Sequence, residues 1–161
     1  MLMYLLEHKF SKHIKEANYN YYEPKTLHDS SLSLSTHAVL ASDLEDTELA
    51  YSLFEKASII DLGPDMESSN HGIHAASLGG IWQIVVCGFA GVRMIDGTLR
   101  INPRLPNNVK SISYPIVWNS NPLKIEVNKN SITIKNLGAT SVSVQVYGKD
   151  YTIENEIKIN Y

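Results

Sequence analysis

Two short stretches hold most of the polar side chains that could do chemistry in the first half of the chain. Residues 27–33 read LHDSSLS, and residues 68–77 read SSNHGIHAAS. Each stretch precedes a run with few or no charges, which predicts that each one starts a helix. The unpaired N–H groups of a helix's first turn, joined by hydroxyls and imidazoles, favour an anion. The plainer alternatives are a well-capped helix for the first stretch and a satisfied core histidine for the second.

Both stretches belong to a helical part of the chain. We expect Asp29 or Ser30 to cap the third helix, Asp46 the fourth, and Asn70 or the serines before it the fifth. The predicted helices cover residues 2–8, 11–21, 30–44, 47–60 and 72–91.

The order of these helices predicts how the two polar stretches meet. An apolar helix (30–44) is followed by an amphipathic one (47–60) and by a charge-free one (72–91), the order expected of inner and outer helices in a barrel. The helices on either side of one outer helix run parallel, so both polar stretches should face one pocket. Three helices cannot close a barrel, so we expect partner helices outside this chain.

Several apolar or small residues on the charge-free helix receive structural interpretations. Trp82 and Phe89 are predicted core residues. Close approach of neighbouring helices is predicted at Gly79, Gly80, Gly88 and Gly91.

The second part of the chain predicts strands. Apolar residues alternate with polar ones, and turn compositions such as NSNP and GATS separate the segments. The predicted strands cover residues 112–118, 123–129, 131–137, 142–148, 151–153 and 156–160. The sequence therefore predicts an α+β chain with helices over 1–95, then a linker and a small antiparallel β-domain over 96–161.

Composition excludes several functions. With a net charge of −3, the chain has no positive field that would attract nucleic acid or an acidic membrane surface. No segment looks like a transmembrane span. A single cysteine, Cys87, rules out a disulfide framework and suits a reducing, cytoplasmic setting. No familiar metal or dinucleotide motif is present, and no carboxylate pair accompanies the pocket residues. We expect no metal, no cofactor and no catalytic residue that can be assigned in this chain.

Several motifs in order resemble one known family. The segments YYEPKTLHDSSLSLSTHAVLASDL, AYSLFEKASIIDL, GIHAASLGGIWQIVVCGFAGVR and LRINPRLP are similar to the C-terminal part of glycoside hydrolase family 65. That family includes maltose, kojibiose, nigerose and trehalose phosphorylases. The resemblance implies the last helices of an (α/α)6 barrel followed by the family's small C-terminal β-domain, with the catalytic glutamate upstream of this sequence.

The resemblance also implies a reaction and a set of binding residues. In inverting phosphorolysis, inorganic phosphate attacks the anomeric carbon of a disaccharide and gives β-glucose 1-phosphate and a free sugar. Phosphate is a co-substrate that needs no general base. Ser30, Ser31 and His74 fall on the phosphate-binding positions, and the residues expected to support the pocket are His28, Asp29, His71, Gly72 and Ser77.

Three consequences follow as expectations. The chain alone should be inactive, and its partner should be the missing barrel segment or a second copy. A family hydrolase stays open, because Asp65 and Glu67 lie close to the predicted pocket. A non-catalytic sugar-binding or structural remnant is the other alternative.

Overall fold

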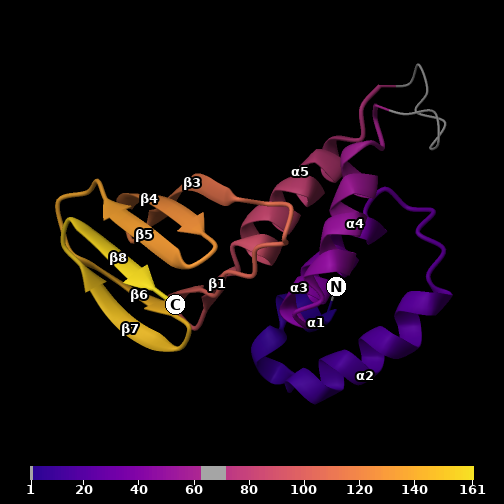
Figure 1. Cartoon of the computed structure of the whole chain (residues 1–161), viewed down its shortest axis with the longest axis horizontal. Coiled ribbons are helices and arrows are strands. Elements are labelled where there is room, and N and C mark those ends of the chain that lie inside the picture. Colours follow the sequence, from indigo (N-terminus) through magenta and orange to yellow (C-terminus); the bar gives the residue numbers. More distant parts are fainter. Residues whose placement is uncertain (1, 63–71) are drawn as a thin grey trace. The chain divides into compact units, whose positions relative to one another are not determined.

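The computed structural model describes residues 2–62 and 72–161 and contains two compact units, Met1–Phe89 and Ala90–Tyr161. The first unit is helical and the second is made of strands (Figure 1). The helices of the first unit are α1 (Leu2–Leu5), α2 (Lys12–Tyr22), α3 (Ser33–Asp43), α4 (Thr47–Ser58) and α5 (Ala75–Gln83). Two 3₁₀ turns (Glu7–Lys9 and Glu23–Lys25) and a π-helical segment, η4 (Ile84–Phe89), complete it.

Helix α3 forms the centre of the helical unit. It contacts α1, α4, α5 and η4, and its Ala38, Val39 and Ala41 are fully buried. Helix α4 is amphipathic as predicted, since Leu53 is buried while Glu55 on the same helix is exposed. The Asp46 cap is confirmed, because its carboxylate accepts a hydrogen bond from Leu49 N at 3.0 Å.

Helices α3 and α5 run parallel, as the alternation of inner and outer helices predicted. A Cβ placed on Gly80 would lie 2.7 Å from Ser35 Oγ near the start of α3. A Cβ on Gly88 would lie 3.5 Å from Ser42 Oγ near the end of α3. The two close contacts therefore occur in the same order along both helices, and both helices begin at the same end of the unit (Figure 1).

Several details of the helical prediction are wrong. Helix α3 begins at Ser33, so neither Asp29 nor Ser30 caps it, and its N-cap Leu32 makes no side-chain hydrogen bond. Helix α5 begins at Ala75, three residues later than predicted, and its N-cap is His74 rather than Asn70 or the serines before it. Trp82 is 57% exposed and is no core residue, whereas Phe89 is buried as expected.

Only some of the predicted glycine contacts between helices are present in the structure. Gly80 and Gly88 do allow the close approach of α3 and α5–η4, whereas Gly79 has nothing within 4 Å of its Cβ position. Gly91 serves the strand unit instead, since its φ is +65° and a Cβ there would lie 1.9 Å from the Asn102 carbonyl oxygen.

The second unit consists of two four-stranded sheets that form a sandwich. One sheet has the order β1-β2-β6-β7 and the other β3-β4-β5-β8. The strands are β1 (Val92–Ile95), β2 (Thr98–Ile101), β3 (Ser111–Trp118), β4 (Asn121–Asn128), β5 (Ser131–Asn136), β6 (Val142–Val146), β7 (Lys149–Ile153) and β8 (Glu156–Asn160).

All pairs are antiparallel except β2 with β6, which are parallel. The inward residues alternate along β4, where Leu123, Ile125 and Val127 are buried and the residues between them are exposed.

The strands from residue 111 onward lie within two residues of their predicted bounds, but β1 and β2 were missed. The proline-punctuated sequence of residues 96–111 predicts a linker, whereas Thr98–Ile101 pairs with Val92–Ile95 in a hairpin. These two strands are only four residues long, too short for an alternating pattern to stand out beside a proline-rich segment.

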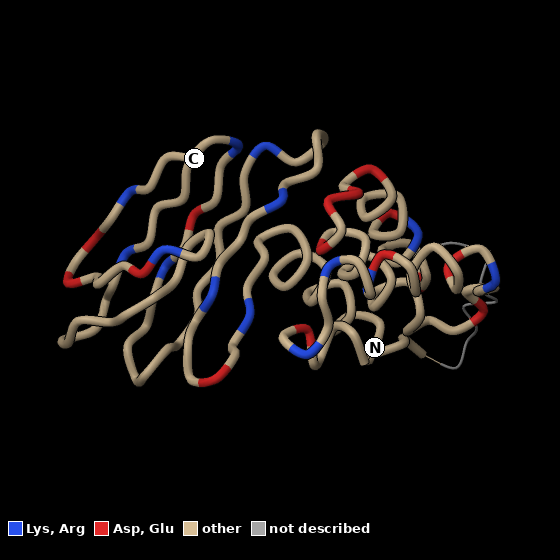
Figure 2. Tube along the Cα trace, turned by 90° about the horizontal axis from the view of Figure 1, so that it is seen from below, with Lys and Arg blue, Asp and Glu red and all other residues tan. Residues whose placement is uncertain are grey.

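The surface carries both charge signs on each unit (Figure 2). No helix among residues 2–62 and 72–161 has the length and apolar character that crossing a membrane requires.

Candidate functional site

The segment with Ser30 and Ser31 forms a turn ahead of α3 rather than its first residues. Ser30 accepts hydrogen bonds through its hydroxyl from Leu32 N (3.3 Å) and through its carbonyl from Ser33 N (3.1 Å). Ser30 is exposed and Ser31 is half-buried, and Asp29 beside them is exposed. The serine hydroxyls therefore lie just beyond the free end of α3, where solutes can reach them.

His74 lies at the corresponding end of α5 as its N-cap, one residue before the first helical turn. Its Nδ1 is 2.6 Å from Asp61 Oδ1, and its backbone N–H donates to Asp61 Oδ2 at 3.0 Å. Asp61 comes from the turn after α4, so one carboxylate fixes both the ring and the backbone of His74. The hydrogen bond from His74 lowers the pKa of Asp61, which outweighs the opposing effect of desolvation.

The remaining predicted pocket residues differ in exposure. Ser77 is 2% exposed, and its Oγ has no hydrogen-bond partner in the described part of the chain. Gly72 is exposed with a φ of +106°, and His71 lies outside the described residues, as do Asn70, Asp65 and Glu67. The parallel course of α3 and α5 places the Ser30–Ser31 turn and His74 at one end of the helical unit.

His28 also belongs to a cluster with Glu23 and His37, which no pattern in the sequence predicts. Its Nε2 lies 3.1 Å from Glu23 Oε1 and its Nδ1 lies 3.1 Å from Ser33 Oγ. The second Glu23 oxygen contacts Nδ1 of His37, which belongs to α3. Desolvation raises the pKa of Glu23, but the hydrogen bonds from His37 and His28 oppose it, and the net effect is a lowered pKa.

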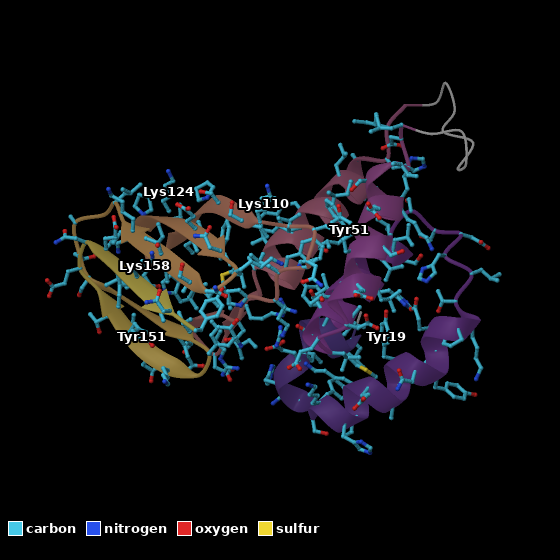
Figure 3. The ribbon with its side chains drawn as sticks, viewed as in Figure 1. Tyr19, Tyr51, Lys110, Lys124, Tyr151 and Lys158 are labelled. Carbon is cyan, nitrogen blue, oxygen red and sulfur yellow. The ribbon has the colours of Figure 1, made fainter. Side chains whose placement is uncertain are left out.

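Two hollows flank this cluster. Glu23 and Tyr19 line both, one of about 370 Å³ towards Asp46 and one of about 220 Å³ towards Leu2. Tyr19 points from α2 towards the other helices (Figure 3), and its hydroxyl donates to the His37 carbonyl at 3.4 Å. Neither hollow is lined by Ser30, Ser31 or His74.

The missed residues carried only weak signals in the sequence. Glu23, His37 and Asp61 stand in three different segments with no motif spacing among them. Histidine and carboxylate pairing across such distances depends on packing, which periodicity does not reveal.

Comparisons with known proteins place both units in one family. Residues 1–83 match the profile of the glycosyl hydrolase family 65 central catalytic domain, and residues 92–153 match that family's C-terminal domain. Kojibiose phosphorylase of Halothermothrix orenii is 44% identical over 96% of this chain, and that of Escherichia coli K12 is 37% identical over 97%. The α,α-trehalose phosphorylase of Thermoanaerobacter brockii is 34% identical over 98%.

The chain spans about 20% of the length of each of these relatives. A solved structure of a candidate kojibiose phosphorylase from the human microbiome superposes with a TM-score of 0.93 at 32% identity. That superposition covers 99% of this chain and 24% of the solved one. With both of its units matched in order, the chain belongs to glycosyl hydrolase family 65, of whose phosphorylases it corresponds to a C-terminal portion.

Proposed function

We propose that this chain supplies the phosphate-binding part of an α-glucoside phosphorylase and that the complete enzyme acts on kojibiose. Relatives named kojibiose phosphorylase reach 37–44% identity, whereas relatives named for trehalose and glucosylglycerol reach 34% and 33%. This ranking supports kojibiose as the first disaccharide to test.

The proposed reaction is inverting phosphorolysis. A general acid from the rest of the barrel protonates the glycosidic oxygen while inorganic phosphate attacks the anomeric carbon. The products are β-glucose 1-phosphate and a free sugar. Phosphate is the only co-substrate and no cofactor takes part. Since phosphate is already an anion, the reaction needs no general base from this chain.

The single observation that carries the proposal is the parallel packing of α3 and α5. Gly80 opposite Ser35 and Gly88 opposite Ser42 align the two helices in the same direction. Their free N–H groups and positive dipole ends therefore open at one end of the unit, where an anion is favoured. Ser30, Ser31 and His74 stand at that end.

The hydrogen bond to Asp61 specifies how His74 would bind. Its Nδ1 is engaged by Asp61 at 2.6 Å, so Nε2 is the ring nitrogen left for a phosphate oxygen. His28 orients the turn through Ser33, Asp29 and Gly72 shape the rim, and the buried Ser77 hydroxyl lies one turn inside α5. His71 is assigned to the same pocket from its position in the sequence.

Exposed apolar side chains on the helical unit support the proposal that this unit packs against further helices of a larger barrel. Ile73, Leu78 and Trp82 are each about half exposed or more. The relatives are about five times as long, since the chain spans 20% of them, so their further helices would cover such side chains. The partner is therefore the remaining barrel segment, with a second copy of the chain as the other way to cover these residues.

Phosphate titration of the purified chain tests the proposal. We expect weak, saturable binding of inorganic phosphate by ³¹P or amide NMR, with shifts at residues 30, 31 and 74. Ser30→Ala/Ser31→Ala and His74→Ala should each weaken binding at least about fivefold. The matched controls His13→Ala and Ser143→Ala change exposed residues elsewhere and should bind as the wild type does. Equal binding by all variants would overturn the assignment.

A further inference from the structure

We propose that Glu23, His28 and His37 form a binding site for a divalent transition-metal cation of the zinc type. The three side chains each offer one ligand atom, and these atoms all lie within 4.8 Å of one another. They come from three segments, the 3₁₀ turn after α2, the connection that follows and helix α3. A cation there would tie the α2–α3 connection to α3.

The donor set suits zinc. Two imidazole nitrogens and one carboxylate are the protein ligands of several zinc sites, which leave a fourth position for water. With metal–ligand distances of about 2.0–2.2 Å, neighbouring ligand atoms stand roughly 3–3.5 Å apart. The separation of His28 Nε2 from Glu23 Oε1 is 3.1 Å, within this range.

The hydrogen bonds around His28 leave its Nε2 lone pair available to a cation. Ser33 Oγ donates its only hydrogen to the Ser30 carbonyl at 3.0 Å, so it can only accept from His28 Nδ1. Nδ1 therefore carries the proton of the neutral ring, and Nε2 presents a lone pair to a carboxylate oxygen. Two acceptors at 3.1 Å need either a shared proton or a metal cation between them, and the proposed site takes the metal cation.

The surroundings complete the features of a metal site. A metal-binding histidine usually donates its other N–H to a nearby oxygen, as His28 does to Ser33. The Glu23, His28 and His37 side chains are 17–20% exposed, so the cluster is shielded but reachable. The hollows beside Glu23 offer an entry path and room for a water ligand.

Zinc titration of the full chain tests the site. We expect isothermal titration calorimetry to show one Zn²⁺ per chain with a dissociation constant below about 10 μM at pH 7.5, and Mg²⁺ at the same concentrations to give no signal. Glu23→Gln, His28→Ala and His37→Ala should each weaken Zn²⁺ binding at least about tenfold. The controls His13→Ala and His74→Ala should leave it unchanged.

A second measurement keeps the test valid if a variant fails to fold. One equivalent of Zn²⁺ added to the wild type should move the imidazole NMR resonances of His28 and His37 and leave those of His8 and His13 in place. Absence of saturable binding would overturn the proposal and leave a proton shared between His28 and Glu23 in place of the metal. Binding that the His74→Ala change abolishes would overturn it as well. Phosphate binding at residues 30, 31 and 74 is read separately, so the two proposals can fail independently.

Discussion

At the scale of single residues, two carboxylates organise the polar end of the helical unit. Asp61 accepts from both the ring and the backbone of His74, and Glu23 contacts both His28 and His37. Neither carboxylate is on the helix whose histidine it holds, since Asp61 follows α4 and Glu23 follows α2. Each therefore links one element to the next through charge-assisted hydrogen bonds.

Removing the Asp61 carboxylate should release the start of α5. In Asp61→Ala the backbone N–H of His74 loses its acceptor at 3.0 Å and becomes open to water. We expect amide hydrogen exchange at residue 74 to become several-fold faster, because this hydrogen bond protects the amide from exchange. The matched variant His74→Ala keeps the backbone donor and the carboxylate. Its exchange at residue 74 should stay near the wild-type rate, and equal acceleration in both variants would contradict the assignment.

Glu23 should make stability depend on pH in the acid range. Its pKa is lowered in the folded chain below the ordinary value of 4.5 by hydrogen bonds from His37 and His28. Its contribution is therefore fully present above about pH 4.5 and is lost as the pH falls through the folded-state pKa. At pH 7, Glu23→Gln should lower the free energy of unfolding by about 1–3 kcal/mol.

Urea unfolding at pH 7, 4.5 and 3, with a chelator present, measures this dependence. The difference between wild type and Glu23→Gln should shrink as the pH falls, because protonated glutamate and glutamine are alike in charge. A difference that stays constant down to pH 3 would show that the carboxylate charge contributes nothing. Glu16→Gln, an exposed change on α2, provides the control.

At the scale of elements, the contact between α3 and α5 decides where the two helix starts lie. Gly80 lets α5 approach Ser35, whose Cβ would be 2.8 Å from a Cβ at position 80. The Cβ of Ser35 is fixed to the backbone of α3, so a larger residue at 80 must push the helices apart. The geometry of the proposed phosphate site therefore depends on a residue that no phosphate would touch.

Adjacent glycines in α5 give a matched test of this contact. Gly80→Ala should destabilise the chain by about 1–3 kcal/mol through overpacking, despite its better helix propensity. Gly79→Ala meets nothing within 4 Å and should stabilise it by up to about 1 kcal/mol. Chemical denaturation of both variants measures the difference. Equal effects at the two positions would show that α3 and α5 are not in close contact at Gly80.

At the scale of the whole molecule, the chain corresponds to one fifth of its phosphorylase relatives. It contains the helices that would hold phosphate and the β-sandwich that follows them. By the family resemblance, the glutamate that protonates the leaving group stands upstream of this sequence. In the proposed function, the chain therefore supplies candidate binding residues, and the rest of the barrel supplies the acid.

The purified chain should consequently make no β-glucose 1-phosphate. Incubation with kojibiose and phosphate, followed by a coupled assay for glucose 1-phosphate, should give the rate of the buffer blank. A complete kojibiose phosphorylase of the family is the positive control. Product above the blank would contradict the absence of the acid, and release of glucose alone would indicate a hydrolase.

Local patterns predicted most of the fold because its causes are local. The strands from residue 111 onward follow an alternation whose buried face can be read directly, as at Leu123, Ile125 and Val127. The Asp46 cap could also be predicted, since a capping carboxylate needs only its own helix. Errors arose where a distant segment decided the outcome, as at Trp82, which lies on an exposed face of an apolar helix.

The sequence by itself determined the order of the helices and of the strands from residue 111 onward, the parallel course of α3 and α5, and the family. It also identified Ser30, Ser31 and His74 as candidates, which stay proposals. Only the tertiary structure showed that Asp61 holds His74 and that Glu23 joins His28 to His37. The physical reason is range: periodicity and capping act within a few residues, whereas these contacts join side chains from elements that packing brings together.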